Sequence, residues 1–190
     1  MKKIILIMSF LISSNLFAQS KVYTFTLDGG FGYSRFFSPI NMDNFNKNGY
    51  SSSLRLMWNP EHLLSAGIES GYYHLYTFKA NLQDSLFGNS NAEVTLSSLP
   101  ILLMFSMKIL PNVKLFAGSG ILLLFSNGSA YGDKFSTSQV SIADHVGASY
   151  TFQWTNKFAI GTEFKYTYIF KFEVAYVSLQ LFAQHELFRW

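Results

Sequence analysis

Residues 99–125 read LPILLMFSMKILPNVKLFAGSGILLLF, which is two apolar runs separated by Pro111-Asn112. Each run is too long for an ordinary soluble hairpin and too interrupted for a pair of helices, so we predict two strands joined by a tight turn. In the first run one alternating set of positions is apolar throughout: Ile101, Leu103, Phe105, Met107 and Ile109. The second run repeats the pattern with Leu115, Ala117, Ile121, Leu123 and Phe125, interrupted only by Ser119. The other set includes Ser106, Lys108, Gly118 and Gly120. This one-sided pattern indicates a hairpin that presents one face to lipid.

The same alternation recurs along the rest of the chain. It predicts strands over residues 22–34, 50–58, 62–76, 99–110, 113–125, 140–154 and 158–170, and a last strand after Glu173. Long polar connections at 37–49, 77–92 and 126–139 alternate with short turns at 59–61, 111–112 and 155–157. The predicted fold class is all-β: an eight-stranded, antiparallel, up-and-down transmembrane β-barrel whose first and last strands pair, because lipid tolerates no open sheet edge.

Loop lengths and aromatic residues indicate how this barrel would lie in a membrane. Outer-membrane barrels have short periplasmic turns and long extracellular loops, so both termini are predicted to be periplasmic. Aromatic residues expected on the lipid face lie near the strand ends: Trp58, Trp154 and Phe158 at the turn end, and Tyr33, Tyr76, Phe125 and Tyr168 at the loop end. Two interfacial girdles are therefore expected. A soluble lipocalin-like barrel would expose too many aromatic side chains to water.

The N-terminus has the features of a secretory signal peptide. Met1-Lys2-Lys3 precedes a short apolar segment, and Ala18-Gln19 offers a small-residue cleavage site. The apolar segment is much shorter than the roughly 20 residues that a membrane-spanning helix needs. We predict a signal peptide at residues 1–18 and one barrel domain at residues 19–190.

Composition excludes several classes of protein. The 14 basic and 11 acidic residues become 12 and 11 once Lys2 and Lys3 are removed, so no nucleic-acid partner is expected. The absence of cysteine excludes a disulfide scaffold. The histidines lack the spacing of metal ligands, and the chain contains no phosphate- or dinucleotide-binding loop. We therefore expect neither a metal nor a cofactor. The histidines are His62, His74, His145 and His185.

Three short segments resemble one family. Leu99-Pro100-Ile101-Leu102, Gly118-Ser119-Gly120 and Glu163-Phe164-Lys165-Tyr166 are similar to segments of the outer-membrane β-barrel domain family that includes PorT-like proteins. The strand rhythm of the whole chain after residue 18 also resembles this family. The resemblance implies an OmpA/OmpX-type eight-stranded barrel in the outer membrane of a Gram-negative cell. It also leaves open a role as a subunit of an outer-membrane secretion or motility machinery.

Five charged residues fall on the predicted inward face: Asp28, Arg55, Glu69, Glu163 and Lys165. The last four lie at similar separations from their nearest short turns, which places them at the middle height of the lumen. Because an unpaired buried charge is costly, we predict that they form a lumen charge network, with Arg55 diagonal to Glu69. The main interpretation of this network is structural, and the alternative is a path for protons or ions.

A barrel of eight strands is filled by its own side chains. We therefore expect a non-enzymatic membrane protein, structural or surface-binding, whose loops carry the variable chemistry. Expected partners are outer-membrane lipid, lipopolysaccharide near Lys47, Lys79 or Lys134, and proteins that contact the loops, and the barrel itself is expected to be a monomer. The remaining alternative is a lipid A-modifying enzyme that uses Ser85 or Ser149 with His74 or His145.

Overall fold

The computed structural model describes residues 23–38, 44–60, 64–84, 88–131 and 133–190. The predicted signal peptide, residues 1–18, lies outside this part of the chain. The elements are β1 (Thr24–Phe37), β2 (Phe45–Asn46), β3 (Asn48–Asn59), β4 (Leu64–Asp84), β5 (Gly88–Leu110), β6 (Val113–Ala130), β7 (Asp133–Gln153), β8 (Phe158–Ile169), the short 3-10 helix η1 (Phe170–Phe172) and β9 (Val174–Arg189). Among the described residues, no helix has the length and apolar character needed to cross a membrane.

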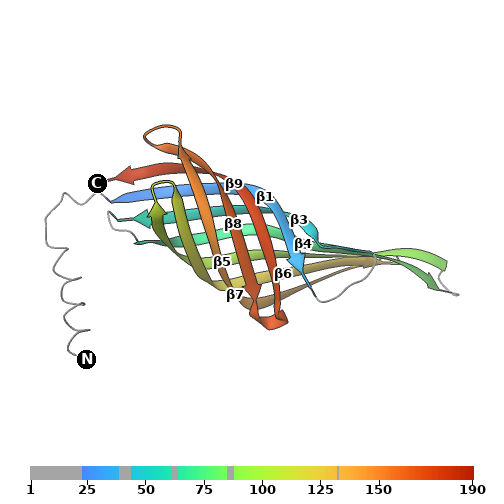
Figure 1. Ribbon diagram of the computed structural model, residues 1–190. Helices are drawn as coiled ribbons and strands as arrows, with labels where there is room; N and C mark the ends of the chain where they lie inside the picture. The colour runs from blue at the N-terminus through green and yellow to red at the C-terminus, as the bar shows by residue number, and fades with distance from the viewer. Residues whose placement is uncertain (1–22, 39–43, 61–63, 85–87, 132) are drawn as a thin grey trace, which may run out of the picture.

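The eight long strands close into a ring in which every neighbouring pair is antiparallel (Figure 1). Consecutive long strands are neighbours, and β9 pairs with β1 from Thr24↔Arg189 to Phe37↔Ala175. The short strand β2 lies on the edge of β4. The predicted eight-stranded antiparallel barrel is therefore confirmed, and so is the pairing of the first and last long strands.

The alternation of side chains between the two faces is also confirmed. In β5, Leu103 is 53 % exposed, whereas its neighbours Leu102 and Met104 are 1 % and 0 % exposed. Most of the predicted outward set of the opening hairpin is exposed, Leu123 and Phe125 are half-buried, and Ser106 is buried in the interior. Since the outward side chains of the hairpin are apolar apart from Ser119, the outer face of the ring is suited to lipid rather than water.

Two of the predicted loops are wrong, because most of each segment is paired strand. Residues 77–84 and 88–92 belong to the distal halves of β4 and β5, which stay paired as far as Asp84↔Gly88. Residues 126–130 and 133–139 likewise belong to β6 and β7, paired as far as Ala130↔Asp133. Beyond the bilayer both faces of a hairpin meet water, so the apolar alternation stops although the backbone pairing continues. The predicted loop at 37–49 also contains β2 and the first residues of β3.

The predicted lipid-facing position of Tyr76 is wrong as well. The register of β4 against β5 shifts between His74 and Tyr76, which is the signature of a β-bulge. The Tyr76 ring packs toward the interior, with its centroid 5.4 Å from that of Phe36 and 4.6 Å from that of Phe45. An extra residue in a strand reverses which side chains face inward beyond it, so strict period-two reasoning fails past the bulge.

A four-stranded sheet made of the distal parts of β4, β5, β6 and β7 extends past the rim of the barrel (Figure 1). On one side, the pairing of β3 with β4 stops at Ser51↔Tyr73, whereas β4 and β5 continue to Asp84↔Gly88. On the other side, the pairing of β7 with β8 stops at Ala143↔Ile169. We call this part the protruding sheet. It lies at the end of the barrel opposite the C-terminus and the β5–β6 and β7–β8 turns.

Candidate functional site

The five predicted lumen residues come from four strands and lie at one level of the interior. Asp28 is on β1, Arg55 on β3, Glu69 on β4, and Glu163 and Lys165 are on β8. Each is on the inward set of its strand, and all five are buried. Arg55 is directly opposite Asp28 on one neighbouring strand and Glu69 on the other. The predicted diagonal placement of Arg55 and Glu69 is therefore wrong, and the true register brings them closer.

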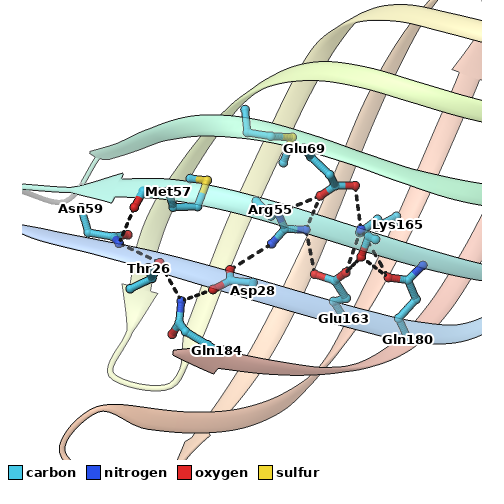
Figure 2. Close-up of polar contacts among 12 residues, drawn as sticks. Thr26, Asp28, Arg55, Met57, Asn59, Glu69, Glu163, Lys165, Gln180 and Gln184 are labelled. Atoms are coloured by element: carbon cyan, nitrogen blue, oxygen red, sulfur yellow. Dashed lines mark hydrogen bonds and ion pairs between the residues drawn. The ribbon is translucent and has the colours of Figure 1, made fainter. Parts of the chain in front are cut away.

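Arg55 is the hub of the lumen charge network (Figure 2). Its Nε donates to Glu69 Oε2 at 2.7 Å, and one terminal nitrogen donates to Glu163 Oε2 at 2.9 Å. The other terminal nitrogen lies 3.8 Å from Asp28 Oδ2. The guanidinium carbon also lies 4.9 Å from the centre of the Phe116 ring. One guanidinium thus holds three carboxylates that belong to three different strands.

Lys165 is the second cation of the network. Its Nζ lies 2.8 Å from Glu69 Oε1 and 2.7 Å from Glu163 Oε1, so both glutamates are shared between Arg55 and Lys165. The same Nζ donates to Tyr73 Oη at 3.4 Å and Gln180 Oε1 at 3.5 Å. Lys165 is 0 % exposed, so these contacts replace its hydration completely.

Neutral polar side chains extend the network toward the turn end of the barrel. Gln184 donates to Asp28 Oδ1 at 2.9 Å and to Thr26 Oγ1 at 3.3 Å, and Asn59 donates to Thr26 Oγ1 at 3.1 Å (Figure 2). On the other side Ser53 donates to Gln180 Oε1 at 2.6 Å. These bonds orient the side chains around the charges and link β1, β3 and β9.

Two apolar clusters lie on either side of the charged level. The cluster toward the protruding sheet contains Phe36, Tyr73, Leu75, Leu122, Leu124, Ala143, Ile169 and Tyr176. The second cluster consists of Met57, Leu102, Met104 and Phe116. The Phe116 ring fits because position 147 is glycine, where a Cβ would lie 2.5 Å from the ring. The cavity beside Asp28 and Arg55 has a volume of only about 10 Å³, roughly enough for a single water molecule.

Sequence reasoning missed two neutral partners of the charges and one histidine. Tyr73 and Gln180 contact Lys165, and His145 Nδ1 lies 4.0 Å from Glu69 Oε1. The alternation places all three on inward positions, but it does not give their heights relative to the charges. Register between strands supplies that height, and a single sequence carries little information about register.

Among the described residues, the serine and the histidines of the enzyme alternative are not brought together. His145 Nε2 contacts Met104 Sδ at 2.8 Å, and His74 Nε2 contacts Thr77 Oγ1 at 3.0 Å, so neither of these two histidines activates a described serine. Ser149 is buried and forms no hydrogen bond with His145 in the described part of the chain. Ser85 and His62 lie outside the described residues.

An antiparallel ring with an apolar outer face and a charged, packed interior defines a transmembrane β-barrel. The chain belongs to the outer membrane protein β-barrel domain family, whose sequence model matches residues 4–184. The resemblance found in the sequence is thus confirmed, and the protein is an outer-membrane protein. No curated protein matches the sequence.

Solved structures of outer-membrane barrels share the fold at low sequence identity. Ail, the attachment invasion locus protein of Yersinia pestis in complex with the heparin analogue sucrose octasulfate, is 16 % identical, with a TM-score of 0.53 over 89 % of this chain and 100 % of Ail. Neisserial surface protein A is 14 % identical, with a TM-score of 0.55 over 86 % and 97 %. A major outer membrane protein of Thermus thermophilus is 10 % identical, with a TM-score of 0.55 over 87 % and 99 %.

Proposed function

We propose that this protein is a non-enzymatic surface-binding protein whose barrel anchors the protruding sheet outside the cell. The edge of β7 in that sheet would pair with an extended segment of another protein. One observation carries this proposal: among the strands that the structure describes, none lies beside the first part of β7 on the side away from β6. Unpaired sheet edges are recognised by strand addition, in which main-chain hydrogen bonds give affinity and alternate side chains give specificity.

The free edge covers residues 133–140 of β7, since η1 packs beside the next residue, Ser141, whose hydroxyl accepts from the Lys171 amide at 3.2 Å. Residues 133–142 pair with β6, but pairing with β8 begins only at Ala143. Every side chain from Asp133 to Val140 is exposed. This segment contains no proline and has a single lysine, Lys134, so it lacks most of the features that protect natural edges from pairing.

The opposite edge of the protruding sheet is covered only near its base, at residues 77–79. The strand β2 pairs with β4 at Phe45↔Phe78 and Asn46↔Thr77, and the Lys79 amide donates to the Asn44 carbonyl at 3.2 Å. Within the described residues, the part of β4 beyond Lys79 (residues 80–84) pairs with β5 alone, so β7 carries the longer of the two open edges. Its greater uncovered length favours β7 over β4 as the strand that receives a partner.

The orientation in the membrane is part of this proposal. The short turns and the C-terminus lie at one end of the barrel and the protruding sheet at the other. Because short turns are periplasmic in bacterial barrels, both termini would be periplasmic and the sheet extracellular. At the outer surface Lys134 would face lipopolysaccharide phosphates, whereas Lys47 donates to the Ser38 carbonyl at 3.2 Å and Lys79 lies 3.6 Å from Glu93. The barrel would act as a monomer in this role.

The packed interior supports a binding role over the alternatives. In the described part of the chain, the cavity at the charged level, between the two apolar clusters, has a volume of only about 10 Å³, which is too small for a solute. No described serine is activated by a histidine, which argues against a lipid A-modifying enzyme. A subunit of a secretion or motility machinery would use the same free edge, with another membrane component as its partner.

Photocrosslinking on intact cells tests the edge. A photoreactive residue at position 137 is expected to give a discrete adduct, whereas one at position 79, which is exposed on the covered edge, should give none. Neighbouring amides of a strand point to opposite edges, so only one of Ser138→Pro and Gln139→Pro removes an outward amide while preserving pairing with β6. That variant should lose the adduct and remain folded.

Two results would contradict the proposal. One is an equal yield of adducts from positions 79 and 137. The other is an adduct at position 137 that survives both proline variants. A change in lipid A mass between cells with and without the protein would instead favour the enzyme.

A further inference from the structure

The outer wall of the barrel carries a groove at the turn end. It has a volume of about 970 Å³, and its apolar lining consists of Phe25, Leu56, Leu187, Phe188 and Trp190. The Trp190 ring stacks on Phe25, with 5.7 Å between centroids, and on Tyr23, with 6.0 Å. Phe25 and Phe188 are register partners on β1 and β9, so the groove crosses the seam that closes the barrel.

A second cavity adjoins the groove but differs in chemistry. It lies at the mouth of the lumen, has a volume of about 390 Å³, and is lined mainly by polar side chains. The two cavities share Asn156, Lys157, Glu186 and Arg189. These residues belong to the β7–β8 turn and to the end of β9, so they form a rim with an apolar groove on one side and a polar cavity on the other.

The polar cavity has an excess of positive charge. Lys108, Lys114, Lys157 and Arg189 line it, and Glu186 is the only acidic residue in its described lining, which leaves a formal charge of +3. Lys108 and Lys114 are directly opposite each other on β5 and β6. Like charges at opposite positions of a sheet repel, and neither lysine forms a salt bridge with a described acid. The excess charge suits a bound anion.

We propose that this rim binds an anionic phospholipid. The phosphodiester would lie against Lys157 and Arg189, which mark the boundary between the two cavities, and an acyl chain would lie in the apolar groove. The guanidinium of Arg189 contacts Glu186 through one nitrogen at 2.5 Å and keeps further donors for a phosphate. The choice of phospholipid over lipopolysaccharide rests on the orientation proposed above, which places the turn end in the periplasmic leaflet.

Native mass spectrometry of the full barrel, exchanged between detergent and lipid, tests the site. The probes are phosphatidylglycerol, zwitterionic phosphatidylethanolamine and lipid A. We expect the barrel to retain phosphatidylglycerol in preference to phosphatidylethanolamine. Lys157→Gln and Arg189→Gln should each reduce this preference about fivefold. Lys157→Arg should keep the preference. The matched control Arg35→Gln with Lys171→Gln removes two exposed charges at the other end of the barrel and should change nothing.

The groove is tested separately by Phe188→Ser, which should weaken retention of both phospholipids without changing their ratio. Glycerol phosphate should compete poorly, because it lacks the acyl chain. Equal retention of phosphatidylglycerol and phosphatidylethanolamine, preferred retention of lipid A, or strong competition by glycerol phosphate would each overturn the proposal. None of these residues lies on the free edge of β7, so the lipid test and the crosslinking test can fail independently.

Discussion

Replacing Arg55 with alanine is expected to lower the free energy of unfolding by about 3–5 kcal/mol, the usual cost of breaking a buried ion pair by removing one partner. Arg55 contacts Asp28, Glu69 and Glu163. Without Arg55, the three buried carboxylates of the network share a single lysine, Lys165, as their remaining basic partner. Desolvated carboxylates that lack a counter-charge are the physical origin of the penalty.

A double-mutant cycle separates this effect from lost packing. Adding Glu69→Ala to Arg55→Ala removes one stranded carboxylate, so the double variant should be more stable than Arg55→Ala alone. The measurement is urea-induced unfolding from vesicles, followed by tryptophan fluorescence. Arg35→Ala is the control, because Arg35 is exposed on β1, and its effect should stay within about 0.5 kcal/mol. Strict additivity of the Arg55 and Glu69 changes would show that the two residues are energetically independent.

The second large effect is expected on the lipid face. Leu103→Arg or Phe164→Arg should cost about 2–4 kcal/mol, because each places a charge near the bilayer midplane. Leu103 and Phe164 are 53 % and 49 % exposed on the outer wall. Ser106→Thr, on the opposite face of β5, should be nearly silent, because it keeps the hydroxyl in the interior.

Refolding from urea into lipid vesicles, compared with refolding into detergent micelles, measures this difference. The arginine variants should lose more stability in vesicles than in micelles, which adapt more readily to a charged side chain. If Leu103→Arg and Ser106→Thr behave alike in vesicles, the assignment of faces in β5 is wrong.

The part of the fold inside the bilayer was predictable because residues that face lipid must be apolar, whereas the alternate residues that face the interior can be polar. The β5–β6 hairpin shows this most clearly, since Leu103 and Phe105 face lipid while Ser106 is buried. The sequence did not predict the protruding sheet, because a sheet with water on both faces needs no alternation of apolar and polar residues. The bulge at His74 was missed because one additional residue changes the facing of Tyr76 without changing composition.

The candidate site was only partly predictable for a related reason. Charges at inward positions of a barrel have few partners except each other, so Arg55, Glu69, Glu163 and Lys165 were grouped from alternation and height alone. The apolar clusters above and below them were not foreseen. Leu102, Met104, Leu122 and Leu124 face inward but are as apolar as their lipid-facing neighbours, so composition does not distinguish the two faces there.

Single-channel recording in planar bilayers measures most directly whether the interior is closed. Insertion is first established by protease protection of vesicles prepared from the same sample. With a charged level held by Arg55 and Lys165 between two apolar clusters, we expect no current steps above the protein-free baseline. A reproducible unitary conductance from the inserted wild-type protein would contradict a filled lumen and show that ions pass through the network.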